Sequence, residues 1–150
     1  MKLDDIYVRD PYILLYEGIY YLYSKISVDA REFVVYRSRN LTDWSEPKTV
    51  FKPKDDFWGK YDFWAPEVHA YRGMFYMLAS FKSDNACRGT HILKANAPDG
   101  DFEPISDDPI TPKDWEALDG TLYIDNNNEP HIVFCHEWEQ IGDGTVCEMR

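Results

Sequence analysis

The chain is short of basic residues, of cysteine and of long apolar runs, and each shortage argues against a class of protein. Its 16 lysines and arginines face 27 acidic residues, which gives a formal net charge of −11. This balance argues against nucleic acid, whose phosphates need basic partners, and against an anionic membrane surface. The three cysteines, Cys87, Cys135 and Cys147, are an odd number without metal-binding spacing. They favour reduced thiols over a disulfide framework.

The sequence also lacks the segments that direct proteins to membranes. No run of 18 or more apolar residues is present, so no transmembrane helix is expected. The opening residues, MKLDDIYVRD, have no apolar core of the kind found in signal peptides. The sequence leaves the compartment open, and of the alternatives we favour the cytoplasm.

Aromatic residues, by contrast, are abundant. They make up 16% of the chain, with 11 tyrosines and 5 tryptophans. Such residues fill cores, and they also line sites in which flat apolar faces meet sugar rings or bases. The acidic net charge argues against bases, so a carbohydrate partner fits better.

The chain repeats itself. The stretch YEGIYYLYS (16–24) aligns with YRGMFYMLAS (71–80), which places Gly18 over Gly73 at an offset of 55 residues. A second match sets Trp44 over Phe102 at an offset of 58, and a third copy begins at LDGTLYIDNNNEPHIVFCH (118–136). Each copy reads as short strands joined by turns, and no segment reads as a long amphipathic helix. A repeat of this length predicts an all-β chain of four-stranded β-propeller blades. A β-sandwich is the alternative, but a sandwich requires no such repeat.

The repeat divides the chain into about two and a half blades of one domain covering residues 1–150. The predicted first blade covers about 6–55, the second about 62–112, and a partial third about 116–150. In a propeller, the first strand of each blade lines the central channel.

Three acidic residues recur near the predicted first strands. Asp10, Glu67 and Asp119 lie 11, 9 and 13 residues ahead of Tyr21, Tyr76 and Ile132, and the third distance becomes 11 without two extra turn residues. These distances differ by even numbers, and even offsets keep side chains on one face of a strand. The pattern therefore predicts three carboxylates at one end of one channel.

The second strands should return to the same rim. The segments expected there are 25–31, 81–89 and 136–144. Predicted substrate contacts from this region are Trp64, Phe81, His136 and Trp138. Glu137 also lies on the predicted rim, and a substrate-binding or structural role is favoured for it over a catalytic one.

Three segments in order, RDPYIL, FWAPEVHAYRGMFYM and LDGTLYIDNNNEPHIVF, resemble the blade openings of glycoside hydrolase family 43. The resemblance implies a five-bladed propeller that hydrolyses arabinose- or xylose-containing glycans with inversion. It implies that Asp10 is the general base and that Asp119 modulates the pKa of the general acid. Glu67, in the Trp-Ala-Pro-acid motif, would line the pocket. The general acid would be a glutamate on the next blade, beyond Arg150.

An inverting glycosidase needs a base that activates water and an acid that protonates the leaving oxygen, with their carboxyl groups about 6.5 to 9.5 Å apart. A third carboxylate nearby would keep the acid protonated. Two alternatives stay open, a non-catalytic glycan-binding propeller and a related five-bladed furanosidase. No cofactor is required and no metal motif is present, while a calcium ion in the channel is left open by the resemblance. The missing C-terminal blades are expected partners, and the 150 residues alone are expected to associate and to be inactive.

Overall fold

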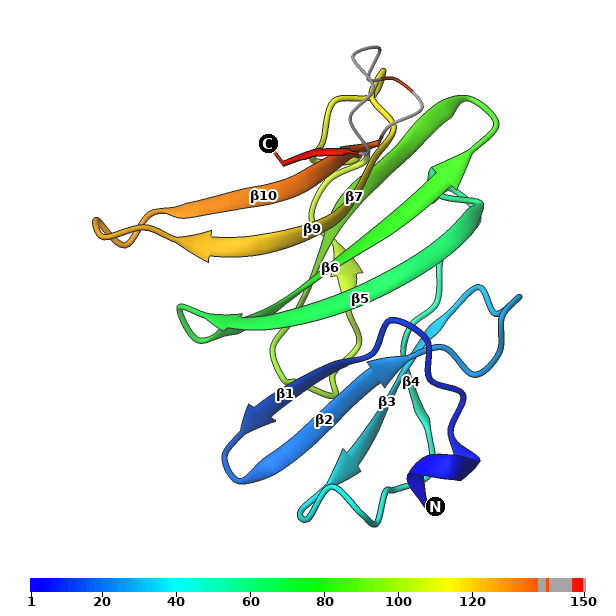
Figure 1. Ribbon diagram of the computed structural model, residues 1–150, viewed down its shortest axis with the longest axis vertical. Coiled ribbons are helices and arrows are strands. Elements are labelled where there is room, and N and C mark those ends of the chain that lie inside the picture. Colours follow the sequence, from blue (N-terminus) through cyan, green and yellow to red (C-terminus); the bar gives the residue numbers. More distant parts are fainter. Residues whose placement is uncertain (138–139, 141–146, 150) are drawn as a thin grey trace.

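The computed structural model describes residues 1–137, 140 and 147–149. It contains three antiparallel sheets, one after another along the chain (Figure 1). The first sheet holds β1 (Tyr12–Tyr16), β2 (Ile19–Ser24), β3 (Phe33–Ser38) and β4 (Lys48–Phe51). The second holds β5 (Tyr61–Tyr71), β6 (Met74–Ser83), β7 (Ala86–Ala95) and β8 (Glu103–Pro104). The third holds β9 (Ala117–Ile124), β10 (Pro130–Glu137) and β11 (Cys147–Met149), and a short 3₁₀ turn, η1 (Leu3–Asp5), precedes them all.

Each sheet is a meander in which strands adjacent in sequence are hydrogen-bonded neighbours. The first strands of successive sheets contact one another, β1 with β5 and β5 with β9, so the sheets fan out from a common inner edge. This is how blades are arranged in a propeller. The prediction of an all-β chain of propeller blades is confirmed. Among the described residues, no helix has the length and apolar character needed to cross a membrane.

The inner hairpins explain why the repeat is visible in the sequence. Gly18 and Gly73 hold the turns after β1 and β5 with φ of 75° and 78°. Glu17 and Arg72, directly before them, also have positive φ, as two-residue turns of type I′ require. In the third sheet Asn128, with φ of 63°, lies in the corresponding turn. Asparagine tolerates this conformation, which is why the NNNEP segment can replace a glycine turn.

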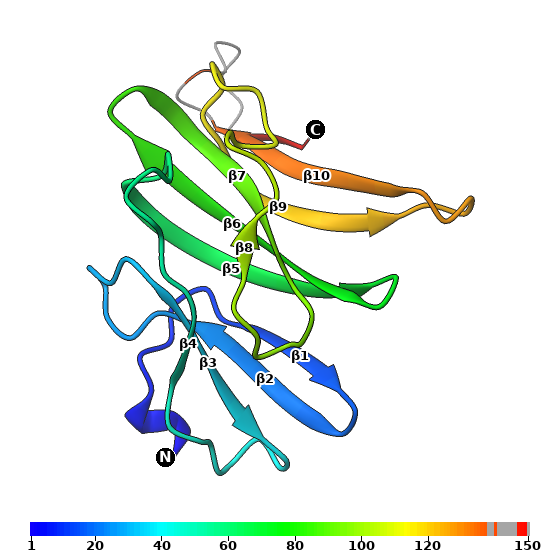
Figure 2. The same cartoon turned by 180° about the vertical axis from the view of Figure 1, so that it is seen from behind.

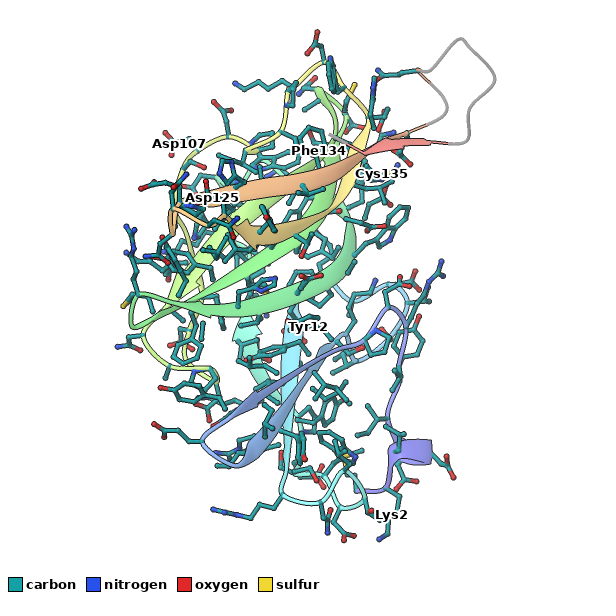
Figure 3. The ribbon with its side chains drawn as sticks, turned by 60° about the vertical axis from the view of Figure 1, so that its left-hand side comes forward. Lys2, Tyr12, Asp107, Asp125, Phe134 and Cys135 are labelled. Carbon is teal, nitrogen blue, oxygen red and sulfur yellow. The ribbon has the colours of Figure 1, made fainter. Side chains whose placement is uncertain are left out.

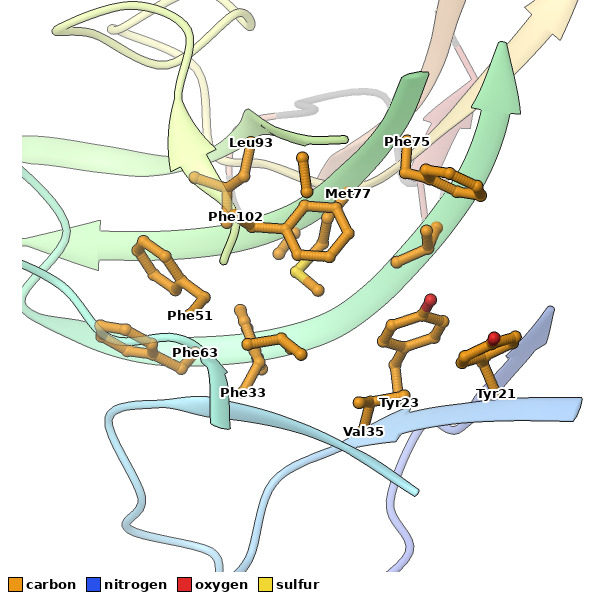
Figure 4. Packing of buried hydrophobic residues seen from close by; sticks show 14 of the residues in the cluster. Tyr21, Tyr23, Phe33, Val35, Phe51, Phe63, Phe75, Met77, Leu93 and Phe102 are labelled. Carbon is orange, nitrogen blue, oxygen red and sulfur yellow. The ribbon is translucent and has the colours of Figure 1, made fainter. Parts of the chain in front are cut away.

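The main core lies between the first two sheets and is largely aromatic (Figure 4). Phe33 and Phe51 of the first sheet contact Phe63 and Phe81 of the second, with ring centroids 4.9 to 6.4 Å apart within this group. Seen from behind, the segment between β7 and β8 reaches back to the first sheet (Figure 2). There the Phe102 amide donates to the Val50 carbonyl at 2.7 Å. The two sheets therefore form one packed unit.

Phe81 is a core residue, and its prediction as a substrate contact is wrong. Its side chain is fully buried among the phenylalanines of this cluster. The segment 81–89 was expected to be a rim loop, but β6 continues to Ser83 and β7 begins at Ala86. Only a tight turn separates these strands, so Phe81 belongs to a strand and faces the neighbouring sheet.

Candidate active site

Three equivalent positions near the starts of the first strands share an unusual backbone. Asp10, Ala65 and Asp119 have φ of 48°, 45° and 53°, in the left-handed region that residues other than glycine seldom adopt. Ala65 follows Asp10 by 55 residues, the same offset that relates the glycines of the two inner hairpins. Such strain costs free energy and is concentrated at functional sites. Two of these three positions carry a carboxylate.

Asp10 lies at the entrance to β1 with its side chain largely exposed. The Arg9 guanidinium is 3.7 Å from its carboxylate. Asp10 lines a small hollow together with Lys25 and Trp64, which come from the loop after β2 and from β5. The carboxylate can therefore reach solvent and a ligand at the same time, as a base that activates water must.

Asp119 is held where β9 packs against the second sheet. Its amide donates to the Ser80 hydroxyl at 3.0 Å, and the amide of Gly120 donates to the Thr90 hydroxyl at 3.2 Å. A Cβ atom on Gly120 would come within 2.6 Å of the Thr90 side chain, so only glycine permits this approach. The Asp-Gly pair is thus part of a strand, although by itself it would signal a turn.

The pKa of Asp119 is raised above the ordinary aspartate value. Its side chain opens to solvent, yet partial burial against the neighbouring strands is the largest cause, followed by the negative charge of Asp10. The charge of Glu67 adds to this effect, and the Arg88 guanidinium opposes it. Asp119 therefore lies close enough to Asp10 and Glu67 for their charges to act on it.

Glu67 does not occupy the position equivalent to Asp10, in keeping with its shorter distance to the next strand, 9 residues against 11. The equivalent residue is Ala65, and Glu67 lies two residues further along β5. There its carboxylate accepts hydrogen bonds from Thr121 and from His69, the latter at 2.5 Å. Burial raises its pKa, but these hydrogen bonds outweigh burial and hold the pKa below the ordinary value.

Tyr12, on the first blade, lies close to the Glu67–His69 pair of the second blade. Its ring lies between β1 and β5 and is 5.7 Å from the His69 ring (Figure 3). Burial and then the charge of Glu67 raise the pKa of its hydroxyl. Glu67 is thus built into contacts across blades, one level below Asp10 and Asp119. In the described part of the chain, no group of three or more His, Cys, Asp and Glu side chains is arranged to hold a metal ion.

Arg88, which the sequence pattern did not single out, links the second and third blades at the rim. Its guanidinium pairs with Asp62 at 3.1 Å and with Glu137, and its side chain is only 12% exposed. It also lies over the Trp64 ring, 4.4 Å from the ring centroid. No local motif marks this residue, because its partners come from two strands, β5 and β10, that lie far from it in the sequence.

The remaining predicted rim residues differ in their surroundings. Trp64 is half-buried and faces the hollow beside Asp10, as expected for a substrate contact. His136 is stacked on Trp115 at 4.3 Å, with its Nε2 atom 3.1 Å from the Gln140 side chain. Glu137 is engaged by Arg88, and its predicted substrate-binding or structural role stays a prediction. Trp138 lies outside the described residues.

Comparison with known proteins identifies the family. The model of glycosyl hydrolases family 43 matches residues 6–150, nearly the whole chain. The chain belongs to glycosyl hydrolase family 43. The resemblance seen in the blade openings is thereby confirmed, and so is the five-bladed propeller class.

Solved structures of family 43 proteins are similar to this chain over about half of their own length. An endo-arabinase from Bacteroides thetaiotaomicron VPI-5482 is 37% identical with a TM-score of 0.90, over 99% of this chain and 51% of the other. A thermostable family 43 glycoside hydrolase is 32% identical with a TM-score of 0.80, over 93% and 46% of the two chains. An extracellular endo-alpha-(1->5)-L-arabinanase of Bacillus subtilis (strain 168) is 22% identical, over 89% of this chain and 45% of its own.

Proposed function

We propose that this chain supplies the base-bearing half of the active site of an inverting glycosidase. Its substrates are arabinose- or xylose-containing glycans, whose O-glycosidic bonds it hydrolyses in polysaccharide degradation. Asp10 is the general base, Asp119 modulates the pKa of the general acid, and the acid is a glutamate beyond Arg150. The observation that carries the proposal is the pair of carboxylates, Asp10 and Asp119, on the same strained position of the first and third blades.

The geometry suits the chemistry of inversion. Asp10 stands in an open hollow, where its carboxylate can take a proton from a water molecule attacking the anomeric carbon. The acid must lie on the other side of the sugar, so a carboxyl from another blade is required. Asp119 lies on the third blade, and its negative charge would raise the pKa of that acid and keep it protonated at neutral pH. Arg88 favours the ionised form of Asp119 that this role needs.

Trp64 would provide the sugar-binding surface. Its ring lies beside Asp10, and one side of it is covered by the Arg88 guanidinium. The part of Trp64 that lines the hollow would pack against an apolar face of a sugar ring. His136 and Glu137 would contribute at the same rim, and Glu67 would shape the channel below it. The whole span of residues 1–150 would belong to one catalytic propeller domain.

The names of two relatives, an endo-arabinase and an endo-arabinanase, make linear arabinan the first substrate to test. The complete protein that carries this chain should release oligosaccharides from arabinan or from xylan. Proton NMR recorded during the first minutes should show the anomer of inverted configuration. Product of retained configuration would contradict the mechanism, and binding without release would instead support a glycan-binding protein.

A further inference from the structure

A basic cleft lies beside Asp10. It is formed by the loop after β2 and by the start of β5, and its volume is about 490 Å³, within the range of small-molecule sites. Its cationic lining consists of Arg9, Lys25, Arg31 and Lys60. We call this surface, together with its wall at Trp64, the basic cleft. It meets the hollow that contains Asp10, because Arg9, Lys25 and Trp64 line both.

The charge of the basic cleft is opposite to that of the chain. The chain as a whole carries 27 acidic and 16 basic residues. The basic cleft has four basic residues and two acidic ones, Asp29 and Asp62. Asp62 is already paired with Arg88 at 3.1 Å. A local excess of positive charge in so acidic a protein indicates an anionic ligand.

Three of these cations have no ion pair with any carboxylate in the described part of the chain. Lys25 donates to the Val28 carbonyl at 2.5 Å, and Lys60 to the Asp55 carbonyl at 2.8 Å. Arg31 lies 5.9 Å from the centroid of the Phe63 ring. Burial and then the nearby Arg9 lower the pKa of Lys25, while Asp29, Asp62 and Asp10 act in the opposite direction. A bound anion would relieve this crowding of positive charge.

We propose that the basic cleft binds the carboxylate of a uronic acid unit of the glycan, while a neighbouring sugar lies over the small hollow at Asp10. This inference rests on the proposed glycosidase function and narrows its substrate to a pentose glycan that carries uronate. A guanidinium can hold a carboxylate through two parallel hydrogen bonds, and Lys25 and Lys60 add charge around it. The negative charge elsewhere on the protein repels an acidic glycan, so the basic cleft also sets its orientation.

The test compares two ligands that differ in one carboxylate. Xylotetraose and xylotetraose bearing one glucuronate are titrated by calorimetry into the complete protein with Asp10→Asn, which is expected to slow turnover greatly. The acidic ligand should bind several-fold more tightly in dilute buffer, and the advantage should shrink in about 0.5 M salt because screening shortens the reach of the charges. Equal affinity for both ligands in dilute buffer would overturn the proposal.

Variants locate the effect. Arg31→Gln combined with Lys60→Gln should lower the ratio of acidic to neutral affinity by about three- to tenfold, the effect of two partly exposed ion pairs. Lys94→Gln is the matched control, because it removes an exposed charge at the opposite end of the second blade and should leave the ratio unchanged. An unchanged ratio of acidic to neutral affinity in the double variant would show that the uronate does not bind in the basic cleft. Thermal melting checks that each variant is folded.

Two further outcomes separate the possible failures. Inorganic phosphate that competes as well as the glucuronate-bearing ligand would mean a general anion site and would overturn the uronate assignment. Hydrolysis of neutral arabinan without any preference for the acidic ligand would leave the proposed function standing and reject the basic cleft as a uronate site. A preference for the acidic ligand without hydrolysis by the wild type would support the basic cleft as a uronate site and reject the proposed glycosidase function.

Discussion

The negative charge of Asp10 raises the pKa of Asp119, although the two residues are on different blades and 109 positions apart in the sequence. Both adopt a left-handed backbone, with φ of 48° and 53°. The fold therefore accepts strain at two places and brings two like charges together. Neither feature helps the protein to fold, and both suit a site in which carboxylates cooperate.

Replacing Asp119 by asparagine should change how activity depends on pH. The substitution removes a negative charge that would keep the general acid protonated, so the pKa of that acid should fall. The basic limb of the pH-rate profile of the complete protein should move down by on the order of one pH unit. Asp101→Asn, an exposed carboxylate in the segment after β7, is the control. An unmoved limb with only a changed KM would make Asp119 a binding residue.

The same substitution should stabilise the fold at neutral pH. The folded-state pKa of Asp119 is raised, so its proton stabilises the folded state at low pH, and that contribution is lost as the pH rises through the folded pKa. Above that pKa the ionised side chain disfavours folding, and asparagine removes the penalty while tolerating the positive φ. The Tm of Asp119→Asn should exceed that of the wild type at pH 7.5, and the difference should narrow toward pH 4. A lower Tm at pH 7.5 would contradict this electrostatic picture.

Arg88 should be important for both stability and sugar binding. Arg88→Met removes the guanidinium that pairs with the carboxylates of Asp62 and Glu137, in a region where the Glu137 side chain is 12% exposed. A loss of about 2 to 4 kcal/mol in the free energy of unfolding is expected. Arg37→Met is the matched control, because its pair with Asp99 is exposed and should contribute about 1 kcal/mol or less.

Urea unfolding followed by tryptophan fluorescence would measure both arginine variants. The Arg88 variant should also raise KM, since Trp64 loses the guanidinium that lies over its ring. Equal losses of stability in Arg88→Met and Arg37→Met would show that the rim network is no stronger than an ordinary surface ion pair.

Phe81→Ala should destabilise the protein by about 3 to 5 kcal/mol, because it opens a cavity in the aromatic core between the first two sheets. Tyr123→Ala, which truncates an aromatic side chain that is 54% exposed, should change stability far less. Thermal melting monitored by circular dichroism would compare the two. A Phe81 variant with an unchanged Tm and a selectively weakened affinity for sugar would restore the rim position expected from the sequence.

The blades could be predicted from the sequence because their signals are local. A glycine or asparagine with positive φ is needed at each inner hairpin, so Gly18, Gly73 and the NNNEP segment mark the repeat directly. Asp10 and Asp119 fall at equivalent positions for the same reason. The number of residues between each carboxylate and the next strand was enough to predict that both lie at one end of the channel.

The features that the sequence did not explain depend on more distant parts of the chain. Bulges in β5 around Trp64 shift its pairing with β6, so Ala65 and not Glu67 matches Asp10. The shorter distance from Glu67 to Tyr76, 9 residues against 11, already indicated this displacement. Arg88 has partners on two other strands, β5 and β10, and no spacing in the sequence brings them together.

The central claim, that Asp10 is the general base of an inverting glycosidase, is tested most directly by Asp10→Asn in the complete protein. Asparagine preserves the size of the side chain and tolerates φ of 48°, so the site should keep its shape. Turnover of linear arabino-oligosaccharides should fall by about 10² to 10⁴, the usual contribution of general base catalysis, while their affinity, measured by calorimetry, should stay within a few-fold of wild type. Asp101→Asn should retain full turnover. Full turnover in Asp10→Asn would contradict the account.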